Sequence, residues 1–254
     1  MTLDIIILAA GQGTRMYSET PKVLHRLAGR PLLAHVIGCA RALQPARIHV
    51  VYGYGGRQVP ERLAEANVAW VLQAEQRGTG HALRLALAGV SDDACVLVLY
   101  GDVPLTRPDS LRPLIAAAAD DRLALMTMEL PEADGYGRIV RDAHGHVARI
   151  VEHKDASNAE RALTEINTGI LAALAARLKK YLAQVKNDNA QGEYYLTDVV
   201  ALAAADGVKI TTLSPADRWE IMGVNTKAQL AELERIHQRN QAQALMEQGV
   251  TLLD

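Results

Sequence analysis

The sequence predicts an α/β fold, a doubly wound and mostly parallel sheet with a long helix at the C-terminus. Short apolar runs alternate with longer stretches of helical periodicity, and the first run, Leu3–Ala10, is continuous in Ile and Leu from Ile5 to Leu8. The last segment, about 226–248, is polar and helical in pattern. Repetition of strand, helix and strand implies parallel pairing through right-handed crossovers.

The first half accounts for most of the predicted sheet. Its strands are short runs rich in Val, Ile and Leu, as expected for strands buried on both faces. They are Leu3–Ala10, Arg47–Tyr52, Val68–Leu72, Cys95–Tyr100 and Leu123–Met128. Helices are expected between them at about 31–43, 57–66, 79–89 and 108–119. Ligands of such sheets bind beyond the carboxyl ends of the strands.

The second half is more mixed. A hairpin is expected because two short runs flank a polar turn that contains glycine. Its strands are Arg138–Val140 and Val147–Glu152, and its turn is Asp142–His146. Helices are expected near 172–185 and 194–205, and strands at Val208–Leu213 and Glu220–Val224.

Composition excludes several classes of protein. The 254 residues carry a net charge of −2, which gives no general attraction to nucleic acid or to anionic membranes. No apolar run approaches the roughly 20 residues of a membrane-spanning helix, and no basic region precedes the first apolar stretch. Two cysteines, Cys39 and Cys95, lie among apolar residues and suggest a reducing compartment. We therefore expect a cytoplasmic protein with no nucleic-acid or membrane partner.

A glycine-rich segment, Leu8-Ala9-Ala10-Gly11-Gln12-Gly13-Thr14-Arg15-Met16, follows the first strand. Small residues let the backbone approach a ligand, and successive N–H groups can form an anion-binding concavity. Arg15 and Lys22, the latter after Pro21, add positive charge close by. This combination suits a triphosphate. An ordinary tight turn is the alternative interpretation.

Two other phosphate-binding motifs are excluded at this position. A dinucleotide fingerprint needs a third glycine where Met16 stands, and a Walker A loop needs Gly-Lys-Ser/Thr, which is absent.

Two later segments also follow predicted strands. Gln73 offers a donor and an acceptor that suit the imide edge of a pyrimidine, and Gly78 and Thr79 open a predicted helix, with Thr79 as its expected cap. Asp102 ends a buried strand and fits the preference of Mg²⁺ for one or two carboxylates plus phosphates and water. An ordinary connection and a turn-forming Asp before Pro are the respective alternatives.

The remaining candidates are individually weak. Glu152 could be a solvated charge, Asn167 a turn residue, and Asn225 or Thr226 a simple helix cap. His153 has no second His or Cys at ligand spacing and is not expected to bind metal.

Taken in order, these motifs resemble those of nucleotidyltransferases that activate sugar 1-phosphates, and most closely the N-terminal half of bacterial bifunctional N-acetylglucosamine-1-phosphate uridyltransferase/glucosamine-1-phosphate acetyltransferases. The resemblance runs through almost the whole chain. It implies a Rossmann-like sheet of the nucleotide-diphospho-sugar transferase type. It also implies a Mg²⁺-dependent enzyme that supplies UDP-N-acetylglucosamine for peptidoglycan, lipopolysaccharide and so for cell wall and cell shape.

The resemblance assigns roles residue by residue. Arg15 and Lys22 would be catalytic, and Asp102 and Asn225 would hold Mg²⁺. The nucleotide would be bound by Leu8, Ala9, Ala10, Gly11, Gly13, Gln73, Gly78 and Thr79. The sugar side would comprise Tyr100, Gly101, Gly137, Glu152, Asn167 and Asn225, with Lys154 and Glu193–Asp198 nearby.

The expected ligands are UTP, N-acetylglucosamine 1-phosphate, UDP-N-acetylglucosamine and pyrophosphate. Residues 1–226 would form the uridyltransferase domain, and 227–254 a helix or linker towards a left-handed β-helix domain that these residues do not contain. The acetyltransferase would not reside here, and this chain is expected to be monomeric, the trimer belonging to the β-helix. Two alternatives stay open: a transferase for another sugar or nucleotide, and a non-catalytic sugar-nucleotide sensor.

Overall fold

The computed structural model describes residues 1–64 and 67–253. Within these ranges the strands of the main sheet number nine. They are β1 (Leu3–Ala9), β4 (Arg47–Tyr52), β5 (Val68–Leu72), β6 (Cys95–Tyr100), β7 (Leu123–Glu129), β8 (Gly137–Arg141), β9 (Val147–Val151), β10 (Glu165–Leu174) and β11 (Ile210–Leu213). A small hairpin, β2 (Arg26–Leu27) with β3 (Arg30–Pro31), lies apart from it.

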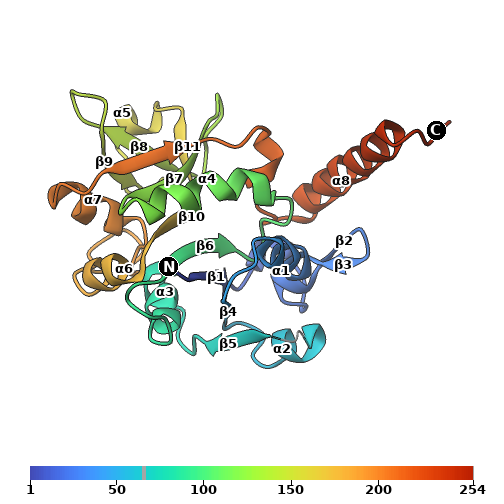
Figure 1. Cartoon of the computed structure of the whole chain (residues 1–254), viewed down its shortest axis with the longest axis horizontal. Coiled ribbons are helices and arrows are strands. Elements are labelled where there is room, and N and C mark those ends of the chain that lie inside the picture. Colours follow the sequence, from blue (N-terminus) through green and yellow to red (C-terminus); the bar gives the residue numbers. More distant parts are fainter. Residues whose placement is uncertain (65–66, 254) are drawn as a thin grey trace.

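The sheet has the order β11-β7-β10-β6-β1-β4-β5. Four of these six neighbouring pairs are parallel, and only the two pairs of β10 with β6 and β7 are antiparallel. The order β5-β4-β1-β6 starts at an edge and reverses direction beside β1, as in doubly wound folds. The predicted fold class is therefore confirmed (Figure 1).

Helices cover both faces of the sheet. They are α1 (Leu32–Ala42), α2 (Gln58–Leu63), α3 (Thr79–Leu87), α4 (Pro108–Ala119), α5 (Asn158–Arg161), α6 (Ala175–Leu182), α7 (Asp198–Ala205) and α8 (Lys227–Glu247). Short 3₁₀ turns occur at Thr14–Met16, Lys22–Leu24 and Arg218–Ile221.

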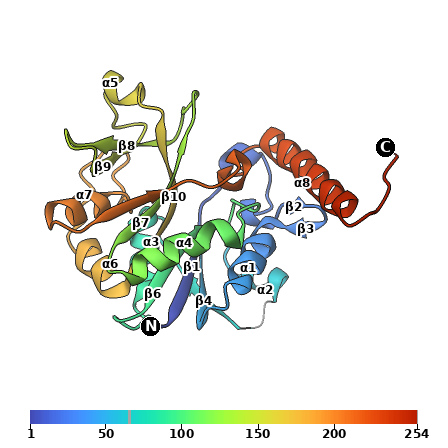
Figure 2. The ribbon, with the colours of Figure 1, turned by 45° about the horizontal axis from the view of Figure 1, so that its top comes forward.

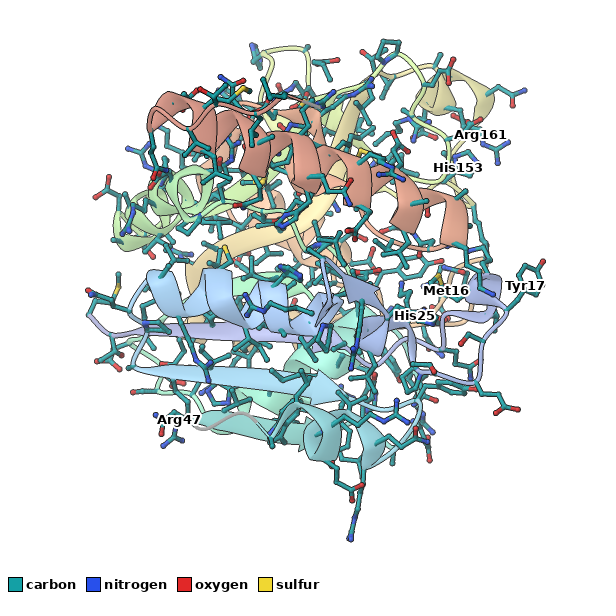
Figure 3. The ribbon with its side chains drawn as sticks, turned by 90° about the vertical axis from the view of Figure 1, so that its right-hand side faces the viewer. Met16, Tyr17, His25, Arg47, His153 and Arg161 are labelled. Atoms are coloured by element: carbon teal, nitrogen blue, oxygen red, sulfur yellow. The ribbon has the colours of Figure 1, made fainter. Side chains whose placement is uncertain are left out.

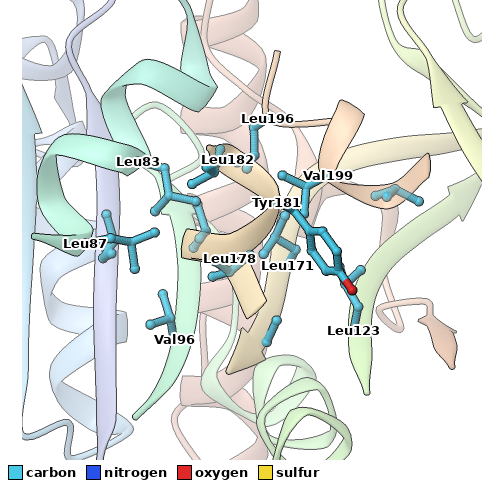
Figure 4. Packing of buried hydrophobic residues seen from close by; sticks show 14 of the residues in the cluster. Leu83, Leu87, Val96, Leu123, Leu171, Leu178, Tyr181, Leu182, Leu196 and Val199 are labelled. Atoms are coloured by element: carbon cyan, nitrogen blue, oxygen red, sulfur yellow. The ribbon is translucent and has the colours of Figure 1, made fainter. Parts of the chain in front are cut away.

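Strand β1 shows why Ile5–Ala9 is a continuous apolar run. Ile6 and Leu8 pack with α3, α6 and α7 on one face, whereas Ile5 and Ile7 pack with α1 and α4 on the other. Alternate side chains of a strand point to opposite faces, so both sets must be apolar. Figure 4 shows the first cluster, in which α3 and α6 meet the strands. Each fully buried Ile or Leu contributes about 1.5–3 kcal/mol of hydrophobic stabilisation.

The hairpin and the C-terminal helix occur where predicted. Strands β8 and β9 pair antiparallel around the turn, where the Asp142 carboxylate accepts hydrogen bonds from the N–H groups of His144 and His146. Figure 2 shows β8, β9 and α5 grouped on the opposite side of the molecule from β2, β3 and α8. Helix α8 projects away from the sheet, and Leu233 is its one buried residue.

One predicted helix begins too early, and one predicted strand is wrong. Residues 172–174 belong to strand β10 and not to a helix, which begins only at Ala175. The apolar run Ile170–Ala175 has no period that distinguishes a buried strand from a buried helix. The segment predicted as strand Glu220–Val224 contains a 3₁₀ turn instead, because the Glu220 side chain turns inward and accepts a hydrogen bond from the N–H of Arg107.

Several boundaries also differ. The helix predicted at 194–205 begins at Asp198, since the Tyr194 backbone is hydrogen-bonded to Arg77 and Gly80 at the start of α3. The predicted strand Val208–Leu213 begins at Ile210. The helix predicted at 57–66 is observed as Gln58–Leu63, and its last two predicted residues lie outside the described ranges. Among the helices described here, none is long and apolar enough to cross a membrane.

Candidate active site

A cavity of about 600 Å³ lies beyond the carboxyl ends of β1, β5 and β6. This is the position expected for a ligand in a doubly wound sheet. Its lining comprises Leu8, Ala9, Ala10, Gly11, Gln12, Gly13, Thr14, Arg15, Lys22, Val23, Gln73, Gln76, Gly78, Thr79, Ala82, Tyr100, Asp102, Gln191 and Glu193. The structure thus brings together every predicted phosphate and base residue in one cavity.

The glycine loop presents free backbone donors to this cavity. The N–H groups of Gly11, Gln12 and Gly13 donate no hydrogen bond within the residues that the structure describes. Gly13 has a φ of 66°, and a Cβ placed on it would lie 2.6 Å from the Cβ of Lys22. Glycine at this position therefore lets the loop turn and lets Lys22 approach. The loop can cradle an anion through its backbone.

Two neighbours in the loop take opposite environments. Met16 is 1% exposed and packs with Leu27, with Val224 and with Leu233, the last of which belongs to α8. Helix α8 therefore anchors the loop. Figure 3 shows Tyr17, the next residue, pointing into solvent. Arg15, one residue before Met16, is exposed and has no ion-pair partner among the described residues. Its guanidinium is therefore available to a phosphate.

Three side chains from distant segments converge beside the loop. The ammonium of Lys22 contacts Asp102 Oδ2 in an ion pair and donates to Asn225 Oδ1 at 3.1 Å. Lys22 and Asp102 are mostly shielded, with side-chain exposures of 12% and 17%. A carboxylate oxygen and an amide oxygen thus already surround one cation. This donor set fits a hard divalent cation, which prefers oxygen ligands.

Asn225 is free for this contact because its neighbour caps the helix. The Thr226 hydroxyl accepts from the Gln229 N–H at 3.2 Å, and the Gln229 side chain accepts in return from the Thr226 N–H. The sequence left the cap open between Asn225 and Thr226, and the structure assigns it to Thr226. The carbonyl of Asp102 accepts from the Val224 N–H at 2.9 Å, which holds the two segments together.

The part of the cavity lined by the predicted base residues Gln73, Gly78 and Thr79, here called the base side, rests on close packing of two backbones. Gly78 has a φ of 99°, and a Cβ there would lie 2.7 Å from the carbonyl oxygen of Tyr194. The N–H of Gly80 donates to that same oxygen at 2.8 Å. Thr79 does not cap α3 as predicted; Gly78 is the N-cap residue, and the Thr79 hydroxyl accepts from the Leu196 N–H at 3.1 Å.

The predicted sugar residues adjoin the cavity and do not line it, apart from Tyr100. Gly137 is paired with Asn167 across β8 and β10, and a Cβ on Gly137 would lie 3.5 Å from Glu152 Oε2. Asn167 Oδ1 accepts from the Gly169 N–H at 3.2 Å. The ring of Tyr100 lies against Gly169 and connects this group to the cavity.

Packing is tight where the predicted sugar residues meet the sheet, since a Cβ on Gly101 would lie 2.9 Å from the Cβ of Ala9.

Burial also shifts the pKa values of two predicted sugar residues, Glu152 and Tyr100. Burial raises the pKa of Glu152, and neighbouring carboxylates raise it further, although the Thr197 hydroxyl donates to Glu152 Oε1 at 2.9 Å and opposes the shift. Burial, with Glu152 and Asp102 nearby, raises the pKa of the Tyr100 hydroxyl. A neutral hydroxyl at Tyr100 can donate a hydrogen bond.

Sequence reasoning missed Gln191 as a lining residue. It lies in a connection between α6 and α7, where no periodicity marks it. Its side chain accepts from Lys154 Nζ at 2.7 Å and donates to the Tyr195 hydroxyl at 2.9 Å. The conspicuous Gln-Gly-Glu-Tyr-Tyr sequence around it was the available signal.

Two curated relatives match this chain over almost its whole length. The bifunctional protein GlmU of Thiobacillus denitrificans is 62% identical over 252 residues, which cover 99% of this chain and 55% of the relative. GlmU of Pseudomonas aeruginosa is 57% identical over 254 residues, covering 100% of this chain and 56% of the relative. The chain therefore spans about half the length of these curated relatives.

Solved structures show the same fold at low identity. Apo UDP-glucose pyrophosphorylase superposes with a TM-score of 0.76 at 15% identity, covering 95% of this chain and 100% of that chain. A nucleotidyl transferase from Methanothermobacter gives a TM-score of 0.68 at 18% identity, covering 94% and 99%.

The domain model for MobA-like NTP transferases matches residues 5–252, nearly the whole chain. Nucleotidyltransferases of this kind generally use a divalent metal, in agreement with the oxygen donors of Asp102 and Asn225. On this match, the chain belongs to the family of MobA-like NTP transferase domains.

Proposed function

We propose that this chain transfers the uridylyl group of UTP to N-acetylglucosamine 1-phosphate, forming UDP-N-acetylglucosamine and pyrophosphate. The observation that carries this proposal is the convergence of Lys22, Asp102 and Asn225 beside a glycine loop with free N–H groups. The name GlmU, carried by the relatives, supports the substrates, because the motifs resemble the N-terminal half of the bifunctional uridyltransferase/acetyltransferase.

The chemistry is an in-line displacement at phosphorus. An oxygen of the sugar phosphate forms a bond to the α-phosphorus of UTP, and the bond from that phosphorus to the bridging oxygen of pyrophosphate breaks. No general base is needed, since the attacking oxygen is already ionised near neutral pH. The work of the protein is therefore positioning and charge stabilisation.

Four side chains would supply that stabilisation. Arg15 and Lys22 would offset the charge on the triphosphate and on the leaving pyrophosphate. Asp102 and Asn225 would hold Mg²⁺, which neutralises phosphate charge when bound. The backbone N–H groups of Gly11 and Gly13 would bind phosphate oxygens through the concavity described above.

The two ends of the cavity would select the substrates. Gln73, Gly78 and Thr79 would bind uracil, with Leu8, Ala9 and Ala10 against the nucleoside. Gly137, Glu152 and Asn167 would bind the hydroxyls and acetamide of the sugar, next to Tyr100 and Gly101. The product would serve peptidoglycan and lipopolysaccharide synthesis. A cytoplasmic location is part of this proposal, because both cysteines are free thiols.

We further propose that the catalytic domain ends near residue 226 and that residues 227–254 form a helical linker, since α8 buries only Leu233. The 254-residue chain would then be monomeric, and light scattering after gel filtration would test this. A mass of two or three chains would contradict it.

Substitution of two residues tests the mechanism. Asp102→Ala and Arg15→Ala should each lower turnover by roughly 100-fold or more, as removal of a transition-state contact does elsewhere. Circular dichroism and thermal melting should show both variants folded. Near-normal turnover in either folded variant would remove that residue from the mechanism.

A substrate panel separates the alternatives. Pyrophosphate release would be measured with UTP, dTTP, CTP and ATP, each with N-acetylglucosamine 1-phosphate and glucose 1-phosphate. We expect the pair UTP and N-acetylglucosamine 1-phosphate to give the highest kcat/KM. Preference for dTTP with glucose 1-phosphate would refute the substrate assignment, and nucleotide binding without Mg²⁺-dependent turnover would favour a sensor.

A further inference from the structure

The side chain of Gln73 has an unusually well-defined set of partners. It is 3% exposed and lines the cavity. Its amide nitrogen Nε2 lies 3.2 Å from the carbonyl oxygen of Gly78 and 3.0 Å from Nδ1 of His81 on α3. Its amide oxygen Oε1 has no hydrogen-bond partner among the described residues, yet it is not one of the fully enclosed unpartnered atoms. Oε1 is therefore the polar atom that faces the cavity.

These contacts determine which way the amide is turned. A backbone carbonyl can only accept, so the amide atom beside Gly78 must be the nitrogen. One hydrogen of Nε2 points to Gly78 and the other to His81. Nδ1 of His81 must then be an acceptor, which requires a neutral imidazole with its proton on Nε2.

The exposed Oε1 can accept a hydrogen bond and cannot donate one. Uracil carries an N–H donor at N3, whereas cytosine carries an unprotonated acceptor at the same position. With Oε1 opposite N3, uracil would gain a hydrogen bond, whereas cytosine at the same position would oppose two acceptors. With the amide reversed, the preference would reverse.

We propose that His81 is a positioning residue that, together with the Gly78 carbonyl, holds the Gln73 amide with its oxygen towards the base, so that the cavity accepts uracil and rejects cytosine. This inference rests on the proposed function, in which Gln73 lies at the base of UTP. His81 touches Gln73 and acts only through it.

The surroundings of His81 keep its imidazole neutral. Burial lowers its pKa, and the positive charges of Arg84 and Arg77 lower it further, while a hydrogen bond to the backbone of Glu75 and the Glu75 charge oppose the shift. Arg84 comes from α3 itself, and its guanidinium carbon stands 5.4 Å from the ring centroid of Tyr194. The segment packed against Gly78 adds one further carboxylate, Glu193.

The test compares UTP with CTP in wild type, His81→Leu and His81→Asn. Leu removes the acceptor, whereas the Oδ1 of Asn places an acceptor where Nδ1 stands. Dissociation constants for both nucleotides would be measured by calorimetry, and kcat/KM by pyrophosphate release. We expect the preference for UTP to fall by about 10- to 100-fold in His81→Leu, as when a buried polar group loses its partner. The change should appear mainly in KM, and His81→Asn should retain most of the preference.

The pH profile gives an independent readout. When His81 is protonated, both ring nitrogens are donors. Nδ1 can then no longer accept from Gln73 Nε2, and the amide loses the contact that helps to hold Oε1 towards the cavity. The UTP to CTP ratio of the wild type should fall as the pH is lowered below the ordinary imidazole pKa of 6.5, while that of His81→Asn stays flat. Effects of pH on the sugar phosphate cancel in this ratio.

Two outcomes would overturn the inference: a wild-type protein that binds UTP and CTP equally, or a folded His81→Leu variant with an unchanged ratio. Failure of the proposed function has a different signature. If no sugar 1-phosphate yields pyrophosphate, the transferase proposal fails, but the calorimetric ratio still tests His81.

Discussion

The substitution Gly78→Ala probes the backbone packing that builds the base side of the cavity. Gly78 has φ 99° and ψ 173°, a region that is almost exclusive to glycine. A Cβ there would lie 2.7 Å from the Tyr194 carbonyl oxygen, 2.9 Å from the Glu193 Cβ and 3.0 Å from the Tyr194 nitrogen. Two of these three atoms are backbone and cannot rotate away.

Two costs add for this variant. Holding a non-glycine residue in that conformation costs about 1–3 kcal/mol. Forcing an extra methyl group into packed surroundings costs about another 1–3 kcal/mol. The free energy of unfolding should therefore fall by about 2–6 kcal/mol, which corresponds to a loss of roughly 5–20 °C in Tm for a chain of this size.

Urea unfolding followed by circular dichroism measures this loss. Gly38→Ala is the matched control: Gly38 lies inside α1 without a positive φ, and its nearest atom to an added Cβ is 3.8 Å away. That variant should be stabilised by up to about 1 kcal/mol. If Gly78→Ala is no less stable than Gly38→Ala, the packing argument for the base side is refuted.

Substitutions at three further positions test other parts of the account. Met16→Ala should lower the free energy of unfolding by about 2–5 kcal/mol and slow turnover, whereas Met16→Leu should cost less than about 1.5 kcal/mol. Equal urea midpoints for the two variants would contradict the role of Met16 in anchoring the loop to α8. Thr79→Val leaves the Leu196 N–H without its acceptor and should cost about 1–3 kcal/mol in the same assay, with Thr79→Ser near wild type. The pKa of Glu152 is raised above its ordinary 4.5, so the folded state holds that proton more tightly and stability falls as pH rises through the window above 4.5. Glu152→Gln should therefore raise Tm more near pH 7 than near pH 4, and an equal gain at both would be inconsistent with the shift.

The sheet could be predicted from sequence because its strands are buried on both faces. Ile5–Ala9 is apolar at every position and serves two clusters, as a strand covered on both faces requires. The apolar run at the end of β10 could not be assigned in the same way. Ala and Leu suit a helix as well as a strand, and a helix does begin at Ala175. Only the pairing with β6 and β7 decides the matter.

The phosphate side of the site was also accessible from sequence, because its residues lie in one short loop. The meeting of Lys22, Asp102 and Asn225 is different, since 80 and 203 positions separate Lys22 from its two partners. Spacing alone could not bring them together, and only the resemblance linked them. Thr79 illustrates the opposite case. Its position at the start of a helix suggested a cap, but its hydroxyl accepts a hydrogen bond from the N–H of Leu196 instead.

The role of His81 had no signal in the sequence. Histidine in the first turn of a helix is unremarkable, and its function follows only from the distance of 3.0 Å to Gln73. Orientation of an amide is a property of its partners and cannot be read from residue types.

The central claim is that this cavity joins UTP to N-acetylglucosamine 1-phosphate with the help of Mg²⁺. The most direct measurement is ³¹P NMR of a mixture of the two substrates and the protein, with MgCl₂ and then with excess EDTA. We predict equal amounts of UDP-N-acetylglucosamine and pyrophosphate with MgCl₂, and neither product with EDTA. No diphosphate-sugar product with MgCl₂, or undiminished product with EDTA, would contradict the account.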